Sequence, residues 1–126
     1  MLGSFQLLVL LTVRILREKA FGAEVYRTLN RFIDKATHPS VHLTLKGLAE
    51  QGLLTMLEPE SRGFGAPRIV YKLTDEGHEV LRRQLLVIFT MYAYMPLEPG
   101  EKRIKPFRPG AQPAVKIRRR KKYPED

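Results

Sequence analysis

The pattern of apolar and polar residues in the first half of the chain predicts three helices. Apolar residues recur at intervals of three and four in three successive stretches, which are Ser4–Lys19, Ala23–Asp34 and Pro39–Gln51. Ser4 is expected to cap the first helix. Pro39 suits the first turn of the third helix, because the nitrogen at that position needs no hydrogen-bond partner. Gly22 separates the first two stretches, and Gly52 stands where a helix-ending residue with positive φ belongs.

The second and third helices each have an apolar stripe that we expect to face a common core. The two stripes are Val25, Leu29, Phe32, Ile33 and Val41, Leu45, Leu48, Ala49. Asn30 falls on the solvent side of the second helix. At 100° per residue, the outward side of the third helix carries Ser40, Leu43, Gly47 and Glu50, with His42 and Lys46 at one flank.

Alternating apolar residues predict a β-hairpin after the third helix. We expect strands over Leu53–Glu58 and Ile69–Leu73, joined by a loop over Pro59–Pro67. Alternate residues of the second strand share one face that we expect to be buried, namely Ile69, Tyr71 and Leu73.

One long helix is predicted over residues 75–96, with Thr74 as its N-cap. Its apolar residues step by four, three, four and three, which is the spacing of a coiled-coil seam. Between Leu85 and Met95 only Thr90 is polar, so one protomer cannot bury this segment by itself. We therefore predict a dimerisation helix whose interface comprises Leu81, Leu85, Ile88, Phe89, Tyr92 and Met95.

The chain changes character after Pro96, where prolines and glycines recur and apolar periodicity ends. The sequence thus predicts a folded domain over residues 1–74, the dimerisation helix, and a disordered basic tail over residues 97–126. Residues 98–126 hold ten basic and four acidic residues, so they carry +6 of the formal charge of +9. Such a charge favours polyanions, nucleic acid first and an anionic membrane surface second. The expected sequence-independent nucleic-acid contacts are Lys116, Arg118, Arg119, Arg120, Lys121 and Lys122.

The composition excludes several classes of function. Without cysteine there is no disulfide framework, thiolate metal site or cysteine nucleophile, which fits a reducing compartment. The apolar run Phe5–Val13 is too short to span a bilayer and lacks the flanking features of a signal peptide, so we expect a buried helix and no membrane partner. His38, His42 and His78 have neither a paired carboxylate nor metal-ligand spacing. We expect no enzyme activity, no cofactor, no metal, and a cytoplasmic location.

Several segments resemble the PadR family of transcriptional regulators. They are SFQLLVLL at residues 4–11, the pair Phe21-Gly22, LKGLAEQGLL at residues 45–54 and YKLTDEG at residues 71–77. The order of three helices, strand, loop, strand and long helix is that of a winged helix-turn-helix. The resemblance implies a mainly α fold with a small β-hairpin wing (α+β), winged-helix over residues 1–74, followed by a long C-terminal dimerisation helix.

The resemblance also implies a nucleoid-associated homodimer that binds double-stranded DNA and represses transcription. A recognition helix presents its outward residues to base edges in the major groove, whereas phosphate contacts fix the register. Here residues 39–51 would enter the groove and residues 59–68 would lie on the backbone. Leu43 suits a thymine methyl group, and Lys46 suits a guanine or a phosphate. The expected DNA contacts are Ser40, His42, Leu43, Lys46, Gly47, Arg62 and Arg68.

Three other interpretations stay open. Uncharged Leu43 and Gly47, beside acidic Glu50, also suit a winged-helix module that docks a protein. A sequence-independent nucleic-acid binder would need only the basic tail, and the same run is compatible with a nuclear-import signal. Phe89, Tyr92 and Tyr94 are also suited to line a small-molecule effector pocket between protomers, although interface core is the commoner role for such residues.

Overall fold

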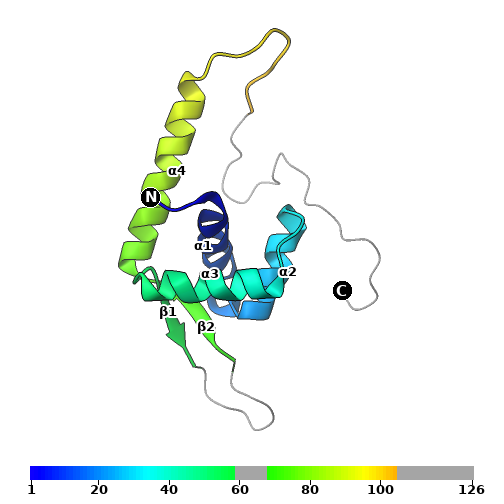
Figure 1. Ribbon diagram of the computed structural model, residues 1–126. Coiled ribbons are helices and arrows are strands. Elements are labelled where there is room, and N and C mark those ends of the chain that lie inside the picture. The colour runs from blue at the N-terminus through cyan, green and yellow to red at the C-terminus, as the bar shows by residue number, and fades with distance from the viewer. Residues whose placement is uncertain (59–67, 105–126) are drawn as a thin grey trace.

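The structure is a computed structural model that describes residues 1–58 and 68–104. In these ranges four α-helices, one 3₁₀ turn and one hairpin follow each other along the chain (Figure 1). The elements are α1 (Ser4–Leu16), η1 (Arg17–Lys19), α2 (Gly22–Phe32), α3 (His38–Glu50), β1 (Leu54–Leu57), β2 (Val70–Leu73) and α4 (Asp75–Tyr94). The expected α+β class, mainly helical with a hairpin wing, is confirmed. The predicted wing loop at Pro59–Pro67 and the tail from residue 105 lie outside the described residues.

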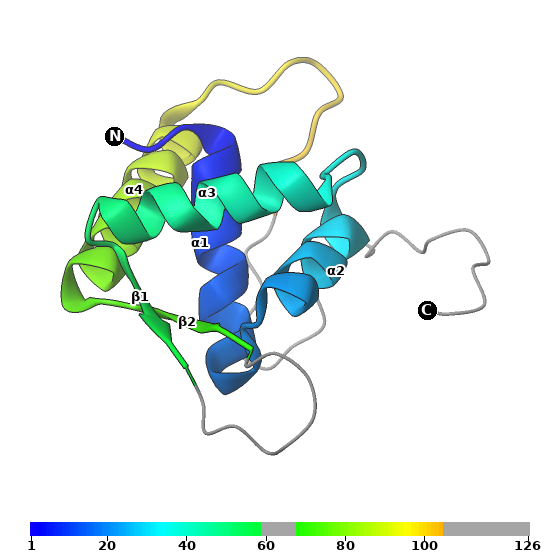
Figure 2. The same ribbon diagram turned by 60° about the horizontal axis from the view of Figure 1, so that its bottom comes forward.

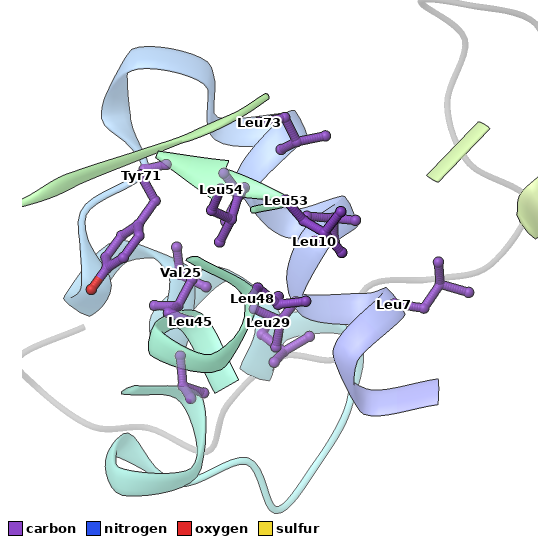
Figure 3. Packing of buried hydrophobic residues seen from close by; sticks show 14 of the residues in the cluster. Leu7, Leu10, Val25, Leu29, Leu45, Leu48, Leu53, Leu54, Tyr71 and Leu73 are labelled. Atoms are coloured by element: carbon purple, nitrogen blue, oxygen red, sulfur yellow. The ribbon is translucent and has the colours of Figure 1, made fainter. Parts of the chain in front are cut away.

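The first three helices enclose one apolar core against the hairpin (Figure 2). Leucines of α1, α2 and α3 meet at its centre, together with Leu53 and Leu54 from the start of the hairpin (Figure 3). The largest fully buried side chains are Leu10, Leu29, Leu45, Leu48, Val9, Val13, Val25 and Val41. Full burial of one such side chain stabilises the fold by about 1.5–3 kcal/mol. The stripe predicted for the third helix is confirmed, since it supplies three of these eight residues.

The hairpin is antiparallel, and the two residues that follow η1 pair with its second strand, β2. Leu54 pairs with Leu73, and Tyr71 N also donates to Ala20 O at 3.0 Å, next to a bridge between Phe21 and Val70. The strands are shorter than expected, so Ile69 precedes β2 and is exposed rather than buried. The other two residues of the predicted inward face are buried. Burial raises the pKa of the Tyr71 phenol above its ordinary value.

Local caps set the boundaries of α1 differently from the expectation. Gly3, not Ser4, is the N-cap, and its N–H donates to the side-chain oxygen of Gln6 at 3.0 Å. The helix ends at Leu16 because Arg17 has a left-handed φ of 54°. A non-glycine residue at such a φ costs on the order of 1 kcal/mol or more. The last turn of the predicted helix is instead the 3₁₀ turn.

The second helix ends at Phe32, two residues earlier than its periodicity indicates. Ile33 is extended, with a φ of −125°, and Phe32, the last residue of the helix, is 46% exposed. Only the first two residues of the predicted stripe are buried. Asn30, expected in solvent, is half-buried and donates to Tyr26 O at 3.1 Å and Ala36 O at 3.3 Å. These two bonds fix the turn that leads into α3.

The start of α4 packs directly on the chain that leaves α3. Thr74 is the N-cap as predicted, and its side chain accepts a hydrogen bond from Gly77 N at 3.0 Å. The same hydroxyl donates to Gly52 O at 2.7 Å, and Gly52 has the expected positive φ of 81°. Gly77 lies against Leu53 so closely that an added Cβ would come within 2.2 Å of the Leu53 carbonyl oxygen. Position 77 therefore requires glycine, because any larger side chain would collide with the Leu53 backbone.

A buried glutamine joins the middle of α4 to the N-terminus. Gln84 is only 8% exposed, and its amide makes two bonds to one residue: Leu2 N donates to Gln84 Oε1 at 2.8 Å, and Gln84 Nε2 donates to Leu2 O at 3.1 Å. Both halves of the amide are thus satisfied by backbone 82 residues away. This clamp fixes the angle at which α4 leaves the core beside α1.

Gln84→Ala should lower the free energy of unfolding by about 1–3 kcal/mol, because it leaves the N–H and C=O of Leu2 without partners in a partly buried place. Chemical denaturation at a fixed protein concentration measures the change. Arg82→Ala, two residues earlier on a solvated side, is the control and should change stability by less than about 0.5 kcal/mol. Equal effects of the two substitutions would show that the clamp is not a stabilising contact.

Part of the predicted tail has a defined conformation in the structure. Beyond α4 the chain doubles back beside the end of the helix (Figure 1). Arg103 donates to Tyr92 O at 2.6 Å and to Met95 O at 2.8 Å, and its guanidinium lies 5.4 Å from the centre of the Tyr92 ring. Ile104 N donates to the Tyr92 hydroxyl. Tyr92 O also accepts from Met95 N at 3.1 Å, so Arg103 adds a second donor there and supplies a partner for the carbonyl of Met95, the C-cap of α4. We call residues 96–104 the strap.

Candidate nucleic-acid interface

One side of α3 is free of the rest of the molecule. The helix lies across the bundle with its buried residues toward α1 and α2 (Figure 2). On the opposite side Leu43 is 66% exposed, and Gly47 is half-buried. Within the described residues, the side chains of His42 and Lys46 make no hydrogen bond or ion pair, so their polar groups are available to a ligand. The exposed side chains on this side are Pro39, His42, Leu43, Lys46 and Glu50.

Ser40 was expected on the DNA-contacting side, but its polar groups are used within α3. The helix begins at His38, and Thr37 is its N-cap. Ser40 N donates to Thr37 Oγ1 at 3.2 Å, Thr37 N donates to Ser40 Oγ at 3.2 Å, and Ser40 Oγ donates to Thr37 O at 3.0 Å. This reciprocal capping box satisfies the first turn. Ser40 therefore helps to position the start of α3.

Two aromatic rings that periodicity does not single out support the beginning of α3. Tyr26 of α2 and His38 stack with ring centroids 3.7 Å apart and an interplanar angle of 24°. The stack joins the helix-turn-helix pair at the point where α3 starts. Tyr26 and His38 are 12 positions apart in the sequence, and no rule about neighbouring residues predicts that their rings meet. We regard the pair as a positioning element for the helix.

Of the two wing arginines that are predicted to contact DNA, the structure describes one, Arg68. Arg68 is exposed, and its guanidinium carbon lies 5.2 Å from the centre of the Phe21 ring. Such a cation–π contact contributes on the order of 0.5–1 kcal/mol at an exposed site, and it restricts where the charge lies. Arg62 lies outside the described residues. The predicted tail cations at positions 116–122 lie outside them as well.

The C-terminal half of α4 exposes a broad apolar surface. Ile88 is 46% and Phe89 65% exposed, whereas Leu81 is only 6% exposed because it belongs to the core of the single chain. Leu81 is therefore unavailable to a partner, and Leu85 is half-buried against the core. Tyr92 is half-buried under the strap. Further exposed apolar residues, not in the predicted interface, are Leu86, Val87, Met91 and Tyr94.

A hollow of about 590 Å³ lies on this surface and has an almost wholly apolar lining of Ile88, Thr90, Met91, Tyr92, Tyr94 and Met95. The N-terminal half of α4 is different in character. Glu79 forms ion pairs with Arg83 at 3.0 Å and Arg82 at 3.2 Å. The hydrogen bond from Arg83, with the charge of Arg82, lowers the pKa of the exposed Glu79 carboxyl. The helix is thus polar where it leaves the core and apolar beyond residue 85.

Two properties of the described ranges bear on other functions. No helix there is both long enough and apolar enough to cross a membrane. No cluster of three or more His, Asp or Glu side chains in those ranges has the geometry of a metal site.

A three-helix core, a hairpin packed beside it, a free third helix and a long following helix define a winged helix-turn-helix protein. A PadR family transcription regulator from Clostridium difficile aligns over 74% of this chain and 95% of its own, with 22% identity and a TM-score of 0.62. One from Eggerthella lenta aligns over 69% and 76%, with 29% identity and a TM-score of 0.58. Bacillus subtilis PadR, solved in complex with operator DNA, aligns over 72% and 57%, with 23% identity and a TM-score of 0.54.

No family model and no curated protein matches the chain. The likeness to the solved structures lies in the order and packing of elements rather than in sequence identity. The chain is PadR-like in fold, and the resemblance expected from its sequence is confirmed.

Proposed function

We propose that this protein is a transcriptional regulator that binds double-stranded DNA sequence-specifically, as a repressor, with α3 in the major groove. The observation that carries the proposal is the free side of α3 on a winged-helix fold, where His42 and Lys46 have no partner within the described part of the chain. An α-helix fits the major groove, and its exposed side chains there meet the donor and acceptor pattern of the bases. The operator complex of Bacillus subtilis PadR gives a precedent in the same fold.

The proposed regulator is a homodimer joined through α4. Apolar residues dominate the exposed surface of this helix after residue 85, and an exposed apolar surface of that kind marks an association site. A two-fold dimer presents two copies of α3, which read two half-sites about one helical turn of DNA apart. The interface residues we assign to the partner contact are Leu85, Ile88, Phe89, Tyr92 and Met95, together with Met91.

The remaining parts have supporting roles in this proposal. Arg68, restrained by Phe21, contacts phosphate at the wing base. Arg62 is a second phosphate contact that the sequence predicts for the wing. The tail cations add a salt-dependent affinity that is independent of sequence. The hollow at Ile88 and Met91 is the place for an apolar effector at the dimer interface. A regulator of this kind works in the cytoplasm on the nucleoid.

Selection from a random duplex library at moderate salt tests the DNA-binding function. The full chain and a chain truncated after Ile104, which keeps the strap, should enrich the same palindromic motif. Enrichment of no motif, with binding lost on truncation, would contradict sequence-specific recognition by α3. It would instead favour the alternative of a protein-docking winged helix with a nucleic-acid-binding tail, for which uncharged Leu43 and acidic Glu50 on α3 are the motivating observation.

Lys46→Ala should weaken operator binding and reduce the slope of log affinity against log salt by about one per protomer, or about two for the dimer. The physical reason is that each phosphate neutralised by a lysine releases a counterion, and alanine cannot neutralise it. Fluorescence anisotropy titrations at salt concentrations from about 50 to about 300 mM, a sixfold range, measure the slope. Lys102→Ala removes the same charge from the strap and is the control. Equal slopes for the two variants would exclude Lys46 from the interface.

A further inference from the structure

The outward side of α3 carries an uncharged ridge along its middle. Pro39, Leu43 and Gly47 follow at intervals of four residues, and residues so spaced are neighbours on one helix face. Only Leu43 projects a long side chain from this ridge. An added Cβ at Gly47 would meet nothing within 4 Å, so the surface one turn after Leu43 is open backbone. Leu43 is therefore the one long apolar side chain of the ridge, and the backbone at Gly47 leaves open space beside it, which we call the shoulder.

None of these three residues has a side chain that can donate or accept a hydrogen bond. The hydroxyl of Ser40, three residues before Leu43, is engaged with Thr37 in the capping box. His42 and Lys46 lie on one flank, where they can reach neighbouring bases or phosphates. The ridge itself can recognise only an apolar group. The apolar group that a base presents in the major groove is the methyl on C5 of thymine.

We infer that Leu43 and the open shoulder at Gly47 bind the C5-methyl group of a pyrimidine, so that each protomer distinguishes a methylated from an unmethylated pyrimidine at one position of its half-site. The inference rests on the proposed function, because it requires α3 in the major groove. Thymine and 5-methylcytosine carry the same methyl group on the same ring atom. Both are therefore sources of the chemistry that Leu43 recognises.

The expected size of the effect follows from burial of one methyl group. Removing the methyl should weaken binding about fourfold in each half-site, and therefore about fifteenfold when both half-sites of the dimer are changed. An effect of this size is well resolved by equilibrium titration. It is also smaller than the effect of removing a bidentate hydrogen-bonded pair, so the two are distinguishable.

The test replaces thymines of the selected operator with uracil, one symmetric pair at a time, and titrates the full-length protein. Uracil lacks only the methyl group and keeps its base pair. One symmetric pair should show a decrease in affinity of about fifteenfold. Leu43→Ala should bind the thymine and uracil operators equally, whereas His42→Ala should bind both more weakly and keep their ratio. A thymine-to-uracil ratio that persists in Leu43→Ala, or no effect at any position, would overturn the inference.

A second arm separates the two sources of the methyl group. At the sensitive position, a C·G pair is compared with a 5-methylcytosine·G pair. Tighter binding of the methylated pair, abolished in Leu43→Ala, assigns 5-methylcytosine as a ligand; an effect confined to thymine assigns thymine alone. If the library yields no motif, the proposed function and this inference fail together. If a motif is enriched but uracil replaces thymine without any decrease in affinity, the inference alone fails.

Discussion

Ile88→Glu should convert the protein to monomers that keep the winged-helix fold. Ile88 is 46% exposed on the single chain, so a charge there costs the protomer little. In the proposed dimer the same position is covered by a partner, and an unpaired buried carboxylate costs several kcal/mol. We expect the dimer dissociation constant to rise by at least about a hundredfold, which corresponds to about 3 kcal/mol. Sedimentation velocity measures the change, and operator affinity should fall with it.

Arg82→Glu is the matched control for this substitution. It introduces a carboxylate on the same helix, in the polar half where Arg82 pairs with Glu79. It should remain dimeric and lose no more than about 1 kcal/mol, because exposed ion pairs contribute little. A folded Ile88→Glu dimer would show that the interface lies elsewhere. An unfolded variant, detected by circular dichroism, would show that no folded monomer exists and that folding and dimerisation are coupled.

Gly77→Ala should lower the free energy of unfolding by about 3 kcal/mol or more. The added Cβ would lie 2.2 Å from Leu53 O, 3.1 Å from Leu53 C and 3.4 Å from Leu53 Cα. These are backbone atoms, so they cannot move aside as the end of a flexible side chain would. The start of α4 must shift away, and the bond from Gly77 N to Thr74 Oγ1 lengthens with it. Chemical denaturation at one fixed protein concentration measures the loss of stability.

Gly47→Ala is the paired substitution and should act in the opposite direction. Position 47 is also inside a helix, but a Cβ there meets nothing within 4 Å. Alanine should stabilise α3 by about 0.5–1 kcal/mol, because glycine loses more backbone entropy on folding. The same methyl group narrows the shoulder beside Leu43, so operator binding should weaken while stability rises. Destabilisation by both substitutions to the same extent would contradict the close packing at Gly77.

The helical periodicity was sufficient for the helices whose stripes face the core, as the burial of Val41, Leu45 and Leu48 shows. It failed at Phe32 and Asn30, because the turn after α2 is fixed by bonds to Tyr26 O and Ala36 O rather than by a continuing apolar pattern. Such bonds join a side chain to carbonyls across a turn. Periodicity records only which side chains are apolar and at what spacing.

In the candidate site, too, some features were predictable from local sequence and others depended on hydrogen bonds that only the structure shows. The sequence indicated Leu43 and Lys46 on the outward side of α3, because a 100° step per residue fixes the face once the buried residues are known. It also indicated Ser40 as a base contact. In the structure Ser40 and Thr37 cap the helix, and a DNA contact of Ser40 stays a prediction. A serine at a helix start suits both roles, and only the position of the Thr37 backbone shows that the capping bonds form.

By itself, the sequence determined the order of elements, the α+β class, the caps at Thr74 and Gly52, and the outward face of α3. These follow from interactions within one turn or one strand, which local residue types specify. Only the tertiary structure decided that Leu81 belongs to the protomer core, that Gln84 is clamped to Leu2, and that Arg103 closes the end of α4. Each depends on atoms that the fold brings together from other elements. Such contacts produce no periodic pattern in the sequence, because the residues that meet depend on the angle at which the helices pack.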